Sequence, residues 1–257
     1  APTGDSFEFP RGGGVWYEPD DDFRSRVLGI FPKQAARAVW SEAWLFEARR
    51  ADLPDTASED IPEIGVDVAR YGDDLTVMYA RRCPLVYARE AYARQGTMET
   101  AGRVADFCRC LPAAPYTVPI KVDDTGVGGG VTDRLAELGF MAVPVNAGER
   151  ASDAERYYNR RSELWFVTAE RGYERRLDLS RLPEEVYSKL SAELRGARYK
   201  IESDGRRRVE SKEEYKKRVG RSPDDADAFN LAFLPAFTAR PGAAAATPWV
   251  ACPGGPL

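Results

Sequence analysis

The stretch IGVDVARYGDDLTVMYA, residues 64–80, decides the fold of this chain. β-Branched residues alternate over 64–68, a pattern typical of a buried strand. A turn around Gly72 follows, and a second apolar run begins at Leu75, so two strands joined by a turn are predicted here. Asp67 lies inside the first strand. Because an unpaired carboxylate is costly to desolvate in such a place, we expect it to be paired or to bind a metal ion.

The composition is that of a globular protein without transmembrane helices. Of the 257 residues, 43% are hydrophobic and 11% aromatic, which suits a packed core. No apolar run of about 18 residues is present, so no contact with a membrane is expected. The chain has no histidine, and its four cysteines form no C-x-x-C pair. Zinc sites built from Cys and His and nucleophiles activated by His are therefore excluded, which leaves carboxylates, lysines, tyrosines or a bound metal ion for catalysis.

Positive charge is concentrated in one segment. The formal net charge is −4, but residues 195–221 contain eleven Lys and Arg residues against five acids. A charge run is often only a solvated face, but a basic segment in an acidic protein also suits contact with a nucleic-acid backbone. The residues predicted to bind DNA are Arg198, Lys200, Arg206, Arg207, Arg208 and Lys212.

The chain divides into three segments. Residues 1–61 form a predicted connector, in which 33–50 has the apolar face of a helix. Residues 62–238 form the main domain. Residues 239–257 form a tail rich in Pro, Gly and Ala with no core-forming pattern, and this tail is predicted to be flexible.

The main domain has an α/β pattern. Its predicted strands are 63–70, 74–82, 85–93, 117–122 and 141–145. Its predicted helices are 97–111, 131–138, 153–171, 182–194, 211–219 and 223–235, and a hairpin with an Asp-Gly turn is predicted over 197–210. Short turns make the first three strands antiparallel neighbours. The helix between the last two strands makes them a parallel pair.

Acidic residues recur where these elements end or begin. Asp123 ends a strand before a glycine-rich turn, and Asp224 opens the last helix, with Ser222 as its predicted N-cap. Asp227 is three residues after Asp224 and shares its helix face, whereas Asp225 points elsewhere. Taken singly, Asp123 and Asp224 are also explained as a turn residue and as an acid that complements a helix dipole.

Together with Asp67, these acids suggest a metal site. Oxygen ligands from two strands and a helix suit Mg²⁺ or Mn²⁺. A carboxylate shared by two such ions is an arrangement that hydrolyses phosphodiesters without a histidine base. The predicted catalytic residues are Asp67, Asp123 and Asp224, and the predicted metal ligands are these three and Asp227.

Three stretches, in this order and spacing, resemble the nuclease domain of the large terminase subunit, part of the DNA-packaging motor of tailed bacteriophages and prophages. They are IGVDVARYGDD (64–74), VDDTGVGGGVTDRL (122–135) and ESKEEYKKRVGRSPDDADAFNLAF (210–233). YNRRSELW (158–165) adds to the resemblance, which covers about residues 62–236.

The resemblance implies a ribonuclease H-like mixed sheet of order 3-2-1-4-5, with strand 2 antiparallel, flanking helices and an added β-hairpin near the DNA. It implies a Mg²⁺-dependent or Mn²⁺-dependent endonuclease that cuts concatemeric viral DNA by a two-metal-ion mechanism. Asp67, Asp123 and Asp224 match the family's three metal ligands, and Asp227 matches an auxiliary carboxylate.

The resemblance also implies partners. These are double-stranded DNA and, in the full motor, an ATPase domain, the portal and the small terminase subunit, in the cytoplasm of the infected or lysogenic bacterial host. The sequence departs from the family because it contains no G-x-x-x-x-G-K-[ST] motif. We therefore do not expect this chain to be a complete packaging motor.

Other functions remain open at this point. A ribonuclease H or a junction resolvase would share the fold and the acids. An actin-type ATPase is less consistent, because Val68 and Ala69 follow Asp67 without the glycine of its phosphate loop. A non-catalytic docking module of the packaging machine, with residues 239–257 contacting the portal, is the alternative outside enzymes.

Overall fold

The computed structural model describes residues 7–8, 12–14, 16–17, 37–53, 61–69 and 74–235. The predicted tail, 239–257, lies outside the described residues, as does most of the predicted connector, 1–61. Within the connector, β1 (Phe7–Glu8) pairs antiparallel with β2 (Trp16–Tyr17), and α2 spans Glu42–Arg49.

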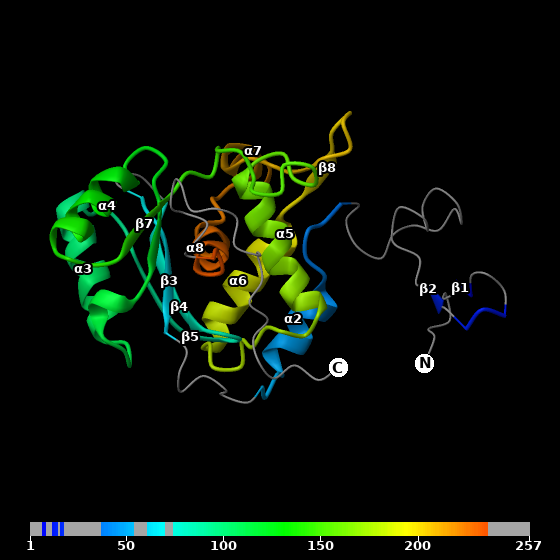
Figure 1. The fold of residues 1–257 in the computed structure, drawn as a ribbon, viewed down its shortest axis with the longest axis horizontal. Coiled ribbons are helices and arrows are strands. Elements are labelled where there is room, and N and C mark those ends of the chain that lie inside the picture. Colours follow the sequence, from blue (N-terminus) through cyan, green and yellow to red (C-terminus); the bar gives the residue numbers. More distant parts are fainter. Residues whose placement is uncertain are drawn as a thin grey trace.

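A five-stranded mixed sheet organises the rest of the chain (Figure 1). Its order is β5-β4-β3-β6-β7, with bounds Leu85–Tyr92, Thr76–Arg82, Glu63–Asp67, Ile120–Asp123 and Ala142–Val145. β4 runs antiparallel to both of its neighbours, whereas β6 runs parallel to β3 and to β7. The predicted order 3-2-1-4-5, with strand 2 antiparallel, is therefore confirmed.

Helices cover both faces of the sheet (Figure 1). α3 (Thr97–Arg109) and α4 (Gly128–Glu137) cover one face. α8 (Asp224–Ala232), α5 (Arg160–Tyr173), α6 (Glu184–Gly196) and α2 lie on the other. Alternation along β3 points Ile64 and Val66 at α3 and α4, and Gly65 and Asp67 at α8. α8 packs directly on β3, since a Cβ on Gly65 would lie 2.2 Å from the carbonyl oxygen of Ala228.

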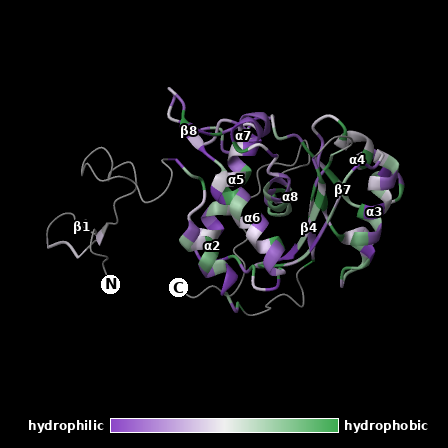
Figure 2. Ribbon diagram, turned by 180° about the vertical axis from the view of Figure 1, so that it is seen from behind, coloured by the Kyte–Doolittle hydropathy of each residue, from purple (hydrophilic) through white to green (hydrophobic). Residues whose placement is uncertain are grey.

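The hairpin and the helix after it were also predicted. β8 (Tyr199–Ile201) pairs antiparallel with β9 (Arg207–Val209), and Gly205 takes a positive φ of 84° in the turn. α7 (Lys212–Val219) begins with a capping box and ends at Gly220. Figure 2 shows α7 and the β8 region as mainly hydrophilic. Among the described helices, none is long and apolar enough to cross a membrane.

Several predicted helix starts were wrong because capping residues lie inside the predicted ranges. α5 begins at Arg160 rather than 153, since the Asn159 side chain accepts a hydrogen bond from the Ser162 N–H. α2 begins at Glu42, after Ser41 caps it, and residues 33–36 of that predicted helix lie outside the described residues.

Three other boundaries differ by a few residues. The three glycines 128–130 form the first turn of α4, which was predicted to begin at 131. Pro223, rather than Ser222, occupies the N-cap position of α8. A 3-10 turn, η1 (Pro115–Thr117), occupies the start of the predicted strand 117–122, so β6 begins only at Ile120.

Candidate active site

Asp67 is the last residue of β3, and its side chain points to the α8 face of the sheet. Only 1% of the residue is exposed. Burial raises the pKa of the Asp67 carboxyl well above its ordinary value, and the charges of Asp227, Asp224 and Asp123 raise it further, while Lys212 opposes this. The Lys212 ammonium group favours the charged form of this carboxyl.

Asp123 ends β6, the parallel neighbour of β3. Because parallel strands end at the same edge of a sheet, Asp123 and Asp67 emerge at one edge, and alternation turns both toward α8. Asp123 Oδ1 accepts a hydrogen bond of 3.0 Å from the Thr125 N–H. Burial raises the pKa of Asp123, although the Thr125 hydrogen bonds partly offset this rise.

The first turn of α8 supplies the other two predicted acids. Asp224 and Asp227 are both buried, with 5% and 8% exposure. Asp224 Oδ2 accepts a hydrogen bond of 2.9 Å from the Leu75 N–H, just before β4. Asp225 points in another direction, as predicted, and accepts hydrogen bonds from Tyr79 and Arg89.

Lys212 lies among these carboxylates. Its Nζ is 2.7 Å from Asp67 Oδ2 and 3.0 Å from Asp224 Oδ1. Burial alone would lower the pKa of Lys212, but Asp67, Asp227 and Asp224 raise it above its usual value, so the side chain is a cation. From the sequence, Lys212 was predicted to bind DNA, because nothing local distinguishes it from the other basic residues of its segment. The structure places it instead between β3 and α8.

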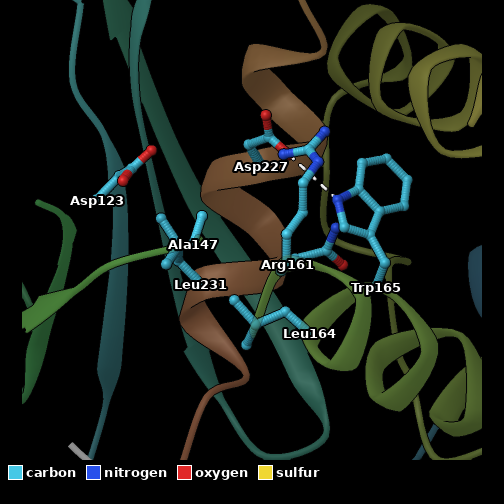
Figure 3. Close-up of a pocket in the computed structure, with 8 residues that line it drawn as sticks. Asp123, Ala147, Arg161, Leu164, Trp165, Asp227 and Leu231 are labelled. Carbon is cyan, nitrogen blue, oxygen red and sulfur yellow. Dashed lines mark hydrogen bonds and ion pairs between the residues drawn. The ribbon is translucent and has the colours of Figure 1, made fainter. Parts of the chain in front are cut away.

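A pocket beside the acids contains two residues to which the sequence alone assigned no role (Figure 3). Arg161 Nη1 lies 2.6 Å from Asp227 Oδ1, and the Trp165 indole N–H donates to the same oxygen over 3.2 Å. Arg161 Nε also donates to the backbone carbonyl of Glu210. Both residues belong to the YNRRSELW stretch, whose only signal in the sequence was its family resemblance. The pocket is lined by Asp123, Ala147, Arg161, Leu164, Trp165, Asp227, Asn230 and Leu231.

The carboxylate oxygens of the site are suitable ligands for a divalent cation. Four carboxylates face two cationic side chains, Lys212 and Arg161, so negative charge is in excess. Oxygen-only donors are those that Mg²⁺ and Mn²⁺ prefer. Within the part of the chain that the structure describes, however, no three of these side chains are already arranged as a ligand group. A metal ion would therefore require Lys212 to move away from Asp67 and Asp224.

The predicted DNA-binding residues of the hairpin differ in their surroundings. Arg198, Lys200 and Arg207 are exposed, and the hairpin projects from the body next to α7 (Figure 1). Arg206 and Arg208 pack over the Tyr158 ring, 5.1 and 4.9 Å from its centroid, and Arg207 packs over the Phe166 ring, 5.2 Å from its centroid. The structure thus brings Asp67, Asp123, Asp224, Asp227 and Lys212 together and leaves the other basic residues on the nearby hairpin.

The chain is similar in fold to proteins of known structure. No protein-family model matches the sequence, and no curated protein matches it. Among solved structures, the nuclease domain of the large terminase subunit gp2 of bacterial virus Sf6 is 20% identical with a TM-score of 0.67, over 76% of this chain and 97% of that one. The chain has the fold of a terminase nuclease domain.

A second phage supports the same conclusion. The large terminase nuclease of thermophilic phage G20c, solved with bound magnesium, is 16% identical with a TM-score of 0.54, over 77% of this chain and 97% of that one. A K428A mutant of the Sf6 domain has also been solved with manganese, and that structure is 19% identical with a TM-score of 0.65. The ribonuclease H-like architecture expected from the sequence is confirmed.

Proposed function

We propose that this chain is a metal-dependent DNA endonuclease. The observation that carries the proposal is the meeting of Asp67, Asp123 and Asp224 at one edge of the sheet, beside a hairpin with exposed basic residues. The likeness in fold to the terminase nuclease domains of Sf6 and G20c supports it. Those domains have been solved with manganese and magnesium, which supports the use of a divalent ion here.

Each acid has a proposed role. Asp67, Asp123 and Asp224 would hold two Mg²⁺ or Mn²⁺ ions. Asp227 would assist through Oδ2, because Arg161 and Trp165 both donate to its Oδ1. Such ions would activate a water molecule and stabilise the leaving oxygen of a phosphodiester. Lys212 holds the acids together by charge when they are not occupied in this way. Arg198, Lys200 and Arg207 would bind the DNA backbone.

The biological setting follows from the same likeness. We infer that the enzyme cuts concatemeric viral DNA during genome packaging, in the cytoplasm of the bacterial host. Its partners would be an ATPase domain, the portal and the small terminase subunit. The fold likeness is to nuclease domains, and this chain spans 97% of each, so the proposal concerns the cutting step rather than translocation.

Cleavage of supercoiled plasmid tests the proposal. With Mn²⁺ or Mg²⁺ the protein should nick and linearise plasmid, and a chelator should stop it. Asp67→Asn should abolish cleavage, because the amide removes a buried anionic ligand while keeping its shape. Asp106→Asn is the matched control, since Asp106 is exposed on α3, and it should cut like the wild type. Equal activity of Asp67→Asn and the wild type would refute the assignment.

Two alternatives are separated by substrate. A ribonuclease H would prefer an RNA–DNA hybrid to duplex DNA, and a junction resolvase would prefer a four-way junction. The exposed basic hairpin could contact the phosphates of each of these substrates, so relative cleavage rates decide between them. A chain that bound DNA but cut none of these substrates with any divalent ion would instead be a non-catalytic docking module.

A further inference from the structure

Asp225 makes a dense set of contacts on the side of α8 that faces away from the acids. Its side chain is fully buried. It accepts hydrogen bonds from Tyr79 Oη over 2.9 Å and from Arg89 Nε and Nη2 over 2.9 and 3.0 Å. Lys189 Nζ lies 2.7 Å from the second carboxylate oxygen. Three residues from other elements therefore contact the Asp225 carboxylate of α8.

These donors come from three separate elements. Tyr79 belongs to β4, Arg89 to β5 and Lys189 to α6. We call Tyr79, Arg89 and Lys189 the Asp225 clamp. The clamp ties the first turn of α8 to two strands of the sheet and to a helix, so it fixes the direction in which Asp225 points.

Glu193 adds a second attachment at the same turn. Its Oε2 accepts a hydrogen bond of 3.0 Å from the Ala226 N–H, one of the free N–H groups at the start of α8. The Tyr215 hydroxyl, in turn, donates to the Glu193 backbone carbonyl over 3.2 Å. α6 therefore holds both the side chain of Asp225, through Lys189, and the backbone of the next residue.

Helix geometry connects this anchor to the acids. Successive residues of an α-helix point about 100° apart, so the direction of Asp225 sets the directions of Asp224 and Asp227. α8 also touches β3 at Gly65, where the helix backbone meets the strand without an intervening side chain. Farther along α8, buried apolar residues such as Phe229 and Leu231 pack into the core. At the first turn, the clamp adds polar contacts to this packing and holds Asp225 in one direction.

We propose that Asp225 is a positioning residue: the clamp holds the first turn of α8, and so the placement of the Asp224 and Asp227 carboxylates relative to Asp67. This inference rests on the proposed function. A buried ion pair is a weak source of net stability, because desolvation offsets its attraction. The clearer consequence of the clamp is therefore orientation of the acids.

The test compares metal binding with folding. The double variant Arg89→Met/Asp225→Asn removes both charges of the bidentate pair together, and the Lys189 side chain, which is 31% exposed, keeps its access to water. Mn²⁺ binding is measured calorimetrically without DNA, and thermal unfolding is followed in parallel. We expect the double variant to fold but to bind Mn²⁺ about 10- to 100-fold more weakly, the range seen when partners of metal ligands are removed. Arg89→Lys, which keeps the charge, should retain part of the affinity.

A control separates orientation from general loss of stability. Val104→Ala lies in the core between the sheet and α3, on the face away from α8. It should lower the melting temperature without changing the Mn²⁺ dissociation constant. An unchanged constant in the double variant, or an equal shift in Val104→Ala, would overturn the positioning role alone. Failure of the wild type to bind Mn²⁺ and to cut DNA would instead refute the proposed function, and the positioning role with it.

Discussion

Lys212 Nζ donates a hydrogen bond to Asp67 Oδ2 over 2.7 Å, joining residues 145 positions apart in sequence. The contact connects the first residue of α7 to the last residue of β3, and α7 directly follows the basic hairpin. A cation from the predicted DNA-binding segment thus lies where a metal ion would be needed. Under the proposed function, metal binding would therefore be coupled to the position of α7.

Replacing Lys212 should destabilise the metal-free protein. In Lys212→Met the buried Asp67 loses its cation, and we expect the free energy of unfolding to fall by up to about 3 kcal/mol, since a broken buried pair leaves an uncompensated charge. Mn²⁺ should stabilise the variant more than the wild type, because in the variant the ion does not compete with the Lys212 ammonium group. Thermal unfolding with and without Mn²⁺ measures both effects. Lys217→Met, on the exposed side of α7, serves as the control. If Lys212→Met and Lys217→Met unfolded identically with and without Mn²⁺, the coupling between metal binding and α7 would be contradicted.

Glu193 should make stability depend on pH. Burial, and the charges of Asp225 and Asp224, raise the pKa of Glu193 to about 8, although the Ala226 N–H and Lys189 oppose the rise. The folded state therefore keeps a proton that the unfolded state loses near pH 4.5. The contribution of Glu193 to the free energy of unfolding is fully present below pH 4.5 and is lost as the pH rises to about 8.

The variant Glu193→Gln isolates this effect. Its amide stays neutral, so relative to the wild type it should gain about 2 to 4 kcal/mol of unfolding free energy between about pH 5 and pH 9. Burial lowers the pKa of Lys121 to about 7, which has the opposite effect, but that residue is common to both proteins and cancels in the comparison. Denaturant unfolding at several pH values gives the difference. Glu185→Gln, exposed on the same helix, should show no trend. A constant difference for Glu193→Gln would show that Glu193 ionises normally.

The hairpin should dominate the salt dependence of DNA binding. Replacing Arg198, Lys200 and Arg207 by Gln should weaken binding of duplex DNA. The slope of log affinity against log salt should flatten by about 0.9 for each phosphate that the variant no longer neutralises. Fluorescence anisotropy over a salt series measures the slope.

A second triple variant is the control for net charge. Replacing Arg103, Arg109 and Arg134 on α3 and α4 by Gln changes the net charge equally and should leave the slope unchanged. Equal slopes for both triple variants would mean that the hairpin has no special part in binding.

Local patterns were enough to predict the five strands and to single out Asp67, whereas the strand order was expected from the family resemblance. Asp67 stood out because an acid inside a β-branched run has no structural role of its own, and strand alternation then places it on the α8 face. The parallel pairing of β6 with β3 brings Asp123 to the same edge. The parallel pair β6-β7 was expected from the helix between these strands, whereas the pairing of β6 with β3 was expected only from the family resemblance.

Contacts between distant segments could not be predicted in this way. Lys212 looks like its basic neighbours, and only the packing of α7 against β3 and α8 separates it from them. The direction of Asp225 followed from helix periodicity, but its partners on β4, β5 and α6 did not. The start of α5 was misplaced because the Asn159 cap competes with a helical pattern that continues before it.

Anomalous scattering from crystals soaked in Mn²⁺ tests the central claim most directly. The account predicts Mn²⁺ peaks within bonding distance of carboxylate oxygens of Asp67, Asp123 and Asp224, with Lys212 displaced from the contacts it makes here. Crystals of Asp67→Asn, soaked in the same way, should lack those peaks. Wild-type crystals with no Mn²⁺ among these three carboxylates, and with Lys212 still bridging Asp67 and Asp224, would contradict the account.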